Sequence, residues 1–191
     1  MCKSKMVVGF VVLLLVAGCV RSIHPLYTEK DLIYEPGLVG TWITKEDGKK
    51  KKDSWTFSKK NEKVYTLVVG EGDTAGSFTA HLMKVKGEMF LDLVPDPPKW
   101  KENEFYRYHV LPVHTFVHVE KIGPTLDMRF PNPDWLGKYL EKNPDALKHE
   151  IEDKQLIVTA SPEAMQAFWL EQLHDKKAFS DAEKMEKVEK Q

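Results

Sequence analysis

Cysteine is almost absent from this chain: the 191 residues include only Cys2 and Cys19. So few cysteines exclude a small domain held together by several disulfides. A large excess of positive charge is also missing, because 28 basic and 29 acidic side chains leave a formal net charge of −1. A nucleic-acid-binding protein needs surplus Lys and Arg to contact phosphates, so we expect no nucleic-acid partner. The remaining composition, 42% hydrophobic and 30% charged, is that of one globular domain.

No apolar run is long enough to span a membrane as a helix. The uncharged stretch from Met6 to Val20 has 15 residues, fewer than the roughly 18 that a spanning helix needs. Two lysines precede it and small residues end it, which is the pattern of an export signal. Its end, Leu-Val-Ala-Gly-Cys over residues 15–19, resembles the lipobox of bacterial lipoprotein signal peptides. The alternatives are an ordinary signal peptide with a chance cysteine, or a membrane anchor.

The lipobox resemblance implies that residues 1–18 are a lipoprotein signal peptide and that Cys19 carries the lipid. Fatty acids such as palmitate would then hold the protein to a membrane of a bacterial cell envelope. Val20 follows the cysteine where an inner-membrane retention signal would have Asp, which favours the outer membrane if the cell has one. No cysteine would remain for a disulfide, a metal site or a thiol nucleophile.

The mature chain divides into three parts by composition. Residues 19–37 are expected to form a lipidated tether and lead-in that docks on the body through apolar side chains. Residues 38–179 are expected to form the β-barrel domain, and residues 180–191 a charged, frayed tail. The apolar side chains of the lead-in are Leu26, Tyr27, Leu32, Ile33 and Tyr34.

From Leu38 onward, short runs of β-branched and aromatic residues alternate with turn signals. This pattern is typical of antiparallel sheet, and the number of runs suits a small closed barrel. The sequence therefore predicts a mainly β fold, an eight- to nine-stranded antiparallel meander barrel. The expected strands are 38–45, 52–58, 63–69, 76–85, 88–94, 104–111, 113–121, 124–130 and 155–160.

Two helices are predicted near residues 133–142 and 162–174. Each begins with a capping residue, a proline and an acid, as in Asn132-Pro133-Asp134. Apolar residues then recur at helical spacing. Because the second helix follows the last expected strand, it should cover one end or side of the barrel.

The segment Gly40-Thr41-Trp42 resembles the start of a lipocalin-type (calycin) barrel. The resemblance implies a lipocalin-like fold in which Trp42 lies across the closed end of the barrel. Lipocalins also place an Arg from the last strand on this Trp. The three arginines here, at positions 21, 107 and 129, offer no such partner.

Over nearly its whole mature length, the chain resembles a group of uncharacterised bacterial envelope lipoproteins. The resemblance implies location and fold, since the group brings no activity with it. It rests on His24–Tyr27, Leu38–Trp42, Ala80–Leu82, Phe90–Leu93 and Pro112–Phe116.

Neither a catalytic site nor a metal site is expected. His114 and His118 share a strand face, but their spacing places them about 13 Å apart, too far for one ion to bridge. The chain lacks a Gly-x-Ser-x-Gly segment, so we predict no enzyme, no cofactor and no catalytic residue. Two histidines converging on a carboxylate would instead indicate a metal or hydrolytic site.

Two functions remain open. The first is a lipid-anchored protein that binds a small apolar ligand inside the barrel. The alternative is an interaction protein with a filled barrel that presents a surface to an envelope partner. A one-residue register shift reverses which face points inward, so the sequence does not decide between them. The candidate ligand-binding residues are Tyr65, His81, Tyr106, Tyr108 and His118.

Overall fold

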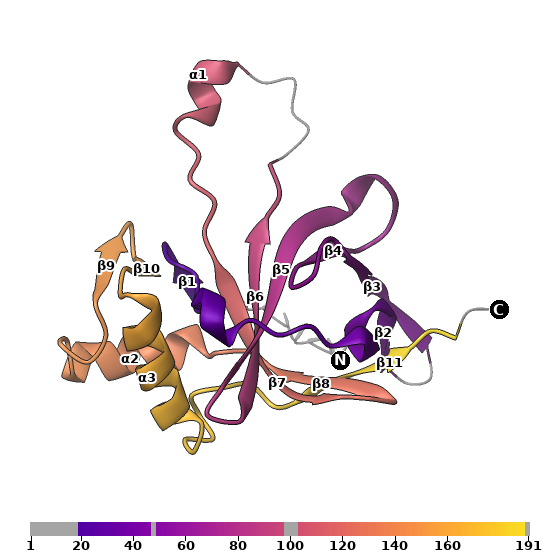
Figure 1. Ribbon diagram of the computed structural model, residues 1–191. Coiled ribbons are helices and arrows are strands. Elements are labelled where there is room, and N and C mark those ends of the chain that lie inside the picture. Colours follow the sequence, from indigo (N-terminus) through magenta and orange to yellow (C-terminus); the bar gives the residue numbers. More distant parts are fainter. Residues whose placement is uncertain (1–18, 47–48, 98–102, 190–191) are drawn as a thin grey trace, which may run out of the picture.

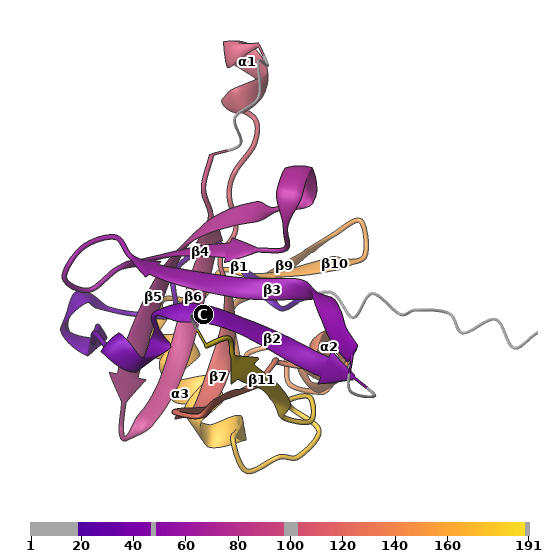
Figure 2. The ribbon, with the colours of Figure 1, turned by 90° about the vertical axis from the view of Figure 1, so that its right-hand side faces the viewer.

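The computed structural model describes residues 19–46, 49–97 and 103–189, and for residues 45–46 and 49–53 the backbone alone. The expected signal peptide, residues 1–18, lies outside this part of the chain. The fold is mainly β and is built on a closed, eight-stranded antiparallel barrel, as predicted (Figure 1, Figure 2). The barrel strands are β2 (Gly40–Glu46), β3 (Lys49–Lys59), β4 (Tyr65–Val69), β5 (Gly76–Val85), β6 (Glu88–Pro95), β7 (Thr115–Ile122), β8 (Thr125–Arg129) and β11 (Glu183–Lys187).

Strands β2 to β8 pair in chain order, which is the predicted meander. The β5–β6 hairpin illustrates how local sequence fixes the register. Lys86 and Gly87 both have positive φ, 50° and 93°, as a two-residue turn of type I′ requires. Val85 therefore lies opposite Glu88, and every following pair in this hairpin keeps that register.

Strand β11 closes the barrel by pairing with β2 on one side and β8 on the other. The expectation of a frayed tail over residues 180–191 is therefore wrong for residues 183–187. In this short strand Met185 points inward and is 1% exposed, while its neighbours Lys184 and Glu186 are exposed. A single inward apolar residue among charged ones gives too weak an alternation to identify a strand from sequence.

A separate three-stranded sheet lies beside the barrel. It contains β1 (Arg21–Ser22), β10 (Gln155–Val158) and β9 (His149–Glu152), in that spatial order. Residues 155–158 are thus a strand, as predicted, but not a strand of the barrel. The physical reason is local: Asp153 and Lys154, with φ of 47° and 63°, turn the chain back so that β10 pairs with β9.

The two predicted helices are present as α2 (Pro133–Lys142) and α3 (Pro162–Gln172). Asn132 and Ser161 cap them by accepting hydrogen bonds from backbone N–H groups of the first turn. Both helices lie on one side of the barrel (Figure 1). The remaining helical segments are short: η1 (Glu29–Asp31), η2 (Pro36–Leu38), η3 (Gly72–Thr74) and α1 (Glu104–Arg107).

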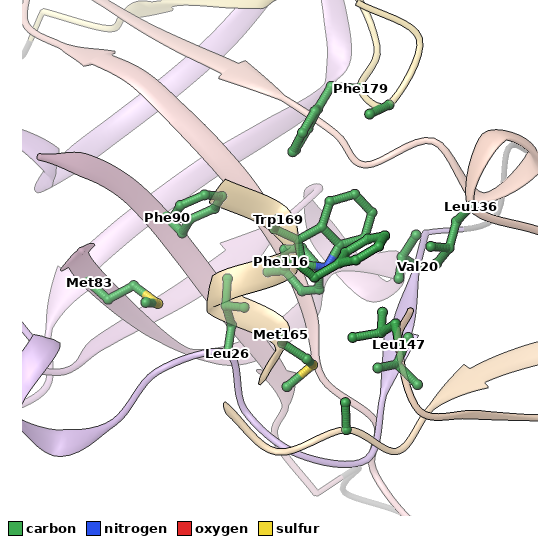
Figure 3. Packing of buried hydrophobic residues seen from close by; sticks show 14 of the residues in the cluster. Val20, Leu26, Met83, Phe90, Phe116, Leu136, Leu147, Met165, Trp169 and Phe179 are labelled. Atoms are coloured by element: carbon green, nitrogen blue, oxygen red, sulfur yellow. The ribbon is translucent and has the colours of Figure 1, made fainter. Parts of the chain in front are cut away.

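The described residues form two hydrophobic cores that share the barrel wall. One core fills the barrel interior. The other lies outside, where Trp169 of α3 packs between the barrel residues Phe90 and Phe116 and the N-terminal Val20 (Figure 3). The lead-in contributes Leu26 to this outer core, at 1% exposed. The predicted docking of the lead-in is confirmed.

Candidate functional site

The barrel interior is filled by its own side chains. Leu82, Leu91 and Leu126 are each 0% exposed and belong to a single cluster with Trp42 and Tyr65. A ligand inside the barrel would have to displace these side chains. The inward face of β5 carries Ala80 and Leu82, so the opposite face, with His81, points outward, because strand side chains alternate. The polar candidates on β5 and β7 therefore lie outside the barrel.

Trp42, the residue of the Gly-x-Trp segment, belongs to this interior core. It is fully buried, and its indole N–H donates to Leu38 O at 2.8 Å. Lys187 of β11 takes the place of the missing arginine, with its ammonium 4.9 Å from the Trp42 ring centroid. The same ammonium donates to Gly37 O at 2.7 Å. Gly40 has a φ of 136°, which residues other than glycine rarely adopt, and a Cβ there would come 2.7 Å from Lys187 Cε.

Tyr65 is the one candidate ligand-binding residue that lies in the interior core. Its hydroxyl accepts a hydrogen bond from Glu35 N at 2.6 Å and donates to Glu35 O at 3.2 Å. Burial raises the pKa of Tyr65 to about 12. Because the hydroxyl is engaged with the lead-in backbone, the structure gives Tyr65 a positioning role for the segment before β2.

A buried polar cluster on the outer face of the barrel joins the lead-in to β5, β6 and β7. At its centre is Asp92 of β6, which is 0% exposed. One of its oxygens accepts from Leu26 N at 2.8 Å, and the other lies 2.7 Å from His114 Nδ1. His81 lies opposite Asp92 in the β5–β6 register and packs against Tyr27, with the two rings tilted and their centroids 4.4 Å apart.

This cluster unites four of the five segments that carry the lipoprotein resemblance: residues 24–27, 80–82, 90–93 and 112–116. Sequence reasoning missed it, although one signal was present: Asp92 is the one acid within the otherwise apolar run of residues 89–95. Such an acid is buried, and a buried carboxylate needs partners. The partners come from distant segments, and a single sequence does not show which ones meet.

His81 and His114 flank the Asp92 carboxylate. Two histidines beside one carboxylate are part of the arrangement that would indicate a metal or hydrolytic site. Both oxygens of Asp92 are already engaged, however, one with Leu26 N and the other with His114. The Ser22 hydroxyl is engaged as well, since it donates to Val158 O and Met165 Sδ. Within the described residues, no group of three or more His, Cys, Asp or Glu side chains is placed to hold a metal ion. The arrangement fastens the lead-in to the barrel wall. Burial lowers the pKa of His81, although Asp92 acts in the opposite direction.

His118 lies at a second place on the outer face, in a groove of about 580 Å³ between the barrel and α3. Its Nε2 is 2.9 Å from Glu88 Oε2. Opposite, Arg129 lies 3.7 Å from Glu120 and donates from Nε to Ser180 O at 3.1 Å. The groove is lined by charged residues and by apolar residues of α3: Lys86, Glu88, His118, Glu120, Arg129, Ala167, Leu170, Glu171, Leu173 and His174.

Tyr106 and Tyr108 lie far from both the Asp92 cluster and the groove beside His118. The strand expected over residues 104–111 is wrong, because residues 104–107 form helix α1 at the tip of an excursion between β6 and β7 (Figure 1). Asn103 caps this helix by accepting from Phe105 N at 2.8 Å, a signal that the β-rich composition obscured. Tyr106 and Tyr108 are 52% and 87% exposed, so neither faces the barrel interior.

No family model, curated protein or solved structure matches this chain. Among the helices of the described residues, none has the length and apolar character needed to cross a membrane. The class of protein is therefore defined by the fold alone, a closed eight-stranded barrel of lipocalin-like form with a helical flank.

Proposed function

We propose that this protein is a lipid-anchored component of a bacterial cell envelope that acts through its outer surface, with the filled barrel as a rigid scaffold. The observation that carries the proposal is the interior core, in which Leu82, Leu91 and Trp42 are each 0% exposed. Of the two functions that the sequence leaves open, this packing favours the interaction protein over the binder of an apolar ligand inside the barrel.

The lipid anchor rests on the lipobox resemblance and is compatible with the position of Cys19. This cysteine is exposed, and Val20, directly after it, is buried at 3% exposed. A lipid on Cys19 would therefore be attached to the folded body itself. Each acyl chain contributes about 0.8 kcal/mol per buried methylene, and more than one chain gives stable anchoring. The outer membrane is the favoured location where the cell has one.

We further propose that the protein is not an enzyme. Catalysis needs ionisable groups that can reach a substrate within a cleft. The buried Asp92 carboxylate is instead engaged with Leu26 N and with the His114 ring of this chain. A binder of a small ligand stays the second candidate, and the groove beside His118 is the observation that favours it.

Native mass spectrometry of the mature lipoprotein, purified in detergent from its own host, tests this proposal. We expect the mass of residues 19–191 plus the covalent lipid, with no further small molecule retained. A retained molecule would contradict the scaffold function. If His118→Leu then abolished retention while Tyr65→Phe did not, the ligand would be assigned to the groove and not to the barrel interior.

A further inference from the structure

Of the large apolar side chains that are exposed in the described residues, all but one lie on the excursion between β6 and β7 or beside the small sheet of β1, β10 and β9. Five of them lie on the excursion between β6 and β7, one on β9, and one directly after β1. The only other such residue, Val188, follows β11. The seven residues on the excursion, on β9 and after β1 are Ile23, Phe105, Tyr106, Tyr108, Val110, Leu111 and Ile151. Contiguous exposed apolar groups of this kind mark surfaces that contact a partner or a membrane.

These residues belong to elements that meet at β1, the strand next to Cys19. Ser22 of β1 exchanges backbone hydrogen bonds with His114, at the base of the excursion, at 2.9 and 2.8 Å. On its other side β1 pairs with β10, whose hairpin partner β9 carries Ile151. Three residues of extended chain span at most about 11 Å, and paired strands lie about 5 Å apart. Cys19 is therefore within roughly 27 Å of Leu111.

The tip of the excursion has the chemistry of a membrane interface. Phe105 and Leu111 are 73% and 66% exposed and would enter the acyl boundary, whereas the hydroxyl of Tyr108 suits the headgroup level. The one arginine of the tip, Arg107, lies 3.8 Å from Glu104. Because this pair is balanced in charge, apolar contact and not attraction to anionic lipid is the expected driving force.

The short path from Cys19 into the folded body decides between a lipid and a protein as the occupant. Val20 is buried and β1 begins at Arg21, so the described chain has no free segment that would let the body move away from a lipid on Cys19. Exposed apolar groups joined to the same strand would lie next to the bilayer that holds this lipid. A protein partner at the same place would have to exclude that bilayer.

We propose that the surface formed by Cys19, the excursion tip (residues 105–111) and Ile151 faces the membrane, and that this tip enters the headgroup region of the leaflet that holds the lipid on Cys19. The inference rests on the proposed lipid anchor. The ligand is a phospholipid surface of low net charge. Figure 1 and Figure 2 show α1 at the end of an excursion that projects away from the barrel, and the β9–β10 hairpin next to β1 at the side of the barrel.

Single cysteines introduced into the lipidated protein test this inference, because Cys19 itself is expected to be blocked by lipid. Tyr108→Cys and Ile151→Cys place an environment-sensitive fluorophore on the proposed surface. Lys84→Cys is the matched control, an exposed strand position near the β5–β6 turn, at the opposite end of β6 from α1 (Figure 1). Each labelled lipoprotein is reconstituted into phosphatidylcholine–phosphatidylethanolamine vesicles, with and without lipids that carry a nitroxide quencher near the headgroup.

We expect blue-shifted emission and severalfold stronger quenching at Tyr108→Cys and Ile151→Cys than at Lys84→Cys. If the protein floats with the vesicles but the Tyr108→Cys probe is quenched no more than the control, this inference is overturned while the lipid anchor stands. If the protein does not float with the vesicles, the anchor itself fails. A probe that is shielded in native membranes but not in protein-free vesicles would also overturn the inference and indicate a protein partner.

Discussion

At the scale of single residues, the contact between Trp42 and Lys187 links the two ends of the barrel sequence. Gly40 leaves room for the Lys187 chain, and the ammonium reaches over the indole to Gly37 O. A lysine thus occupies the position that the lipocalin resemblance reserves for an arginine. Lysine brings one compact charge instead of a planar guanidinium, so it covers the indole by its aliphatic stem and by a cation–π contact.

Trp42→Ala should lower the free energy of unfolding by about 3–5 kcal/mol, because it leaves a large cavity in the interior core. Lys187→Ala should cost only about 0.5–1 kcal/mol, since the ammonium is exposed and its cation–π contact is weak in water. Urea denaturation monitored by circular dichroism measures both. Tyr108→Ala, at an exposed aromatic residue, is the control and should have little effect. Equal losses for Trp42→Ala and Tyr108→Ala would contradict the closed-end role of Trp42.

His81 should make the stability sensitive to mild acid. Burial lowers the pKa of His81 in the folded protein below its usual value of 6.5. The unfolded chain therefore binds the proton more readily, and stability falls as the pH drops below about 6.5. His81→Phe keeps a ring against Tyr27 and removes the titrating group, so it should flatten this dependence. Thermal unfolding across the range from about pH 7.5 to pH 5.5 measures it.

The matched control for His81→Phe is His109→Phe, in the exposed excursion, where His109 Nδ1 lies 2.7 Å from Phe105 O. This variant should keep the pH dependence of the native protein. If both variants changed the slope equally, the buried environment of His81 would not be its source.

At the scale of secondary-structure elements, β11 is the strand whose loss should matter most. It pairs with both β2 and β8, and without it two strand edges and the interior side of the barrel would be open. A chain ending at Asp181 should lose cooperative unfolding or aggregate, and Met185→Ala alone should cost about 2–5 kcal/mol. A chain ending at Val188, which keeps the hydrogen bond from Val188 N to Thr41 O, should behave as the full chain in size-exclusion chromatography and urea denaturation. Native stability in the chain ending at Asp181 would contradict the closing role of β11.

The elements also show what a single sequence can and cannot predict here. Helices α2 and α3 have capping residues, prolines and apolar spacing that agree, and both are found where expected. The excursion at 104–111 and strand β11 were misassigned, because their local patterns are short and tertiary pairing decides them. The filled interior could not be inferred from the sequence, because a shift of the strand register by one residue would place His81 inside the barrel instead of Leu82. The Asp92 cluster depends on contacts between segments up to 66 residues apart, as from Leu26 to Asp92.

At the scale of the whole molecule, the N-terminal segment, the outer core and the barrel form one mechanical unit. Val20 and Leu26 are buried in the same cluster as Trp169 of α3 and Phe116 of β7. Asp92 fastens the lead-in between them. A force or a constraint applied at Cys19 is therefore transmitted directly to the barrel wall. A lipid at this position would fix the orientation of the body and not merely its location.

The anchor itself gives the last prediction. If Cys19 is the lipidated residue, Cys19→Ala should accumulate as a full-length precursor that is not cleaved and takes up no labelled fatty acid. Cys2→Ala is the matched control, because it removes the other cysteine and should leave processing and labelling unchanged. Growth with labelled palmitate, followed by electrophoresis and intact-mass analysis, distinguishes these outcomes. Labelled fatty acid in the Cys19→Ala protein would refute the lipobox assignment, and the proposed membrane-facing surface would then lose its basis, since its orientation depends on a lipid at Cys19.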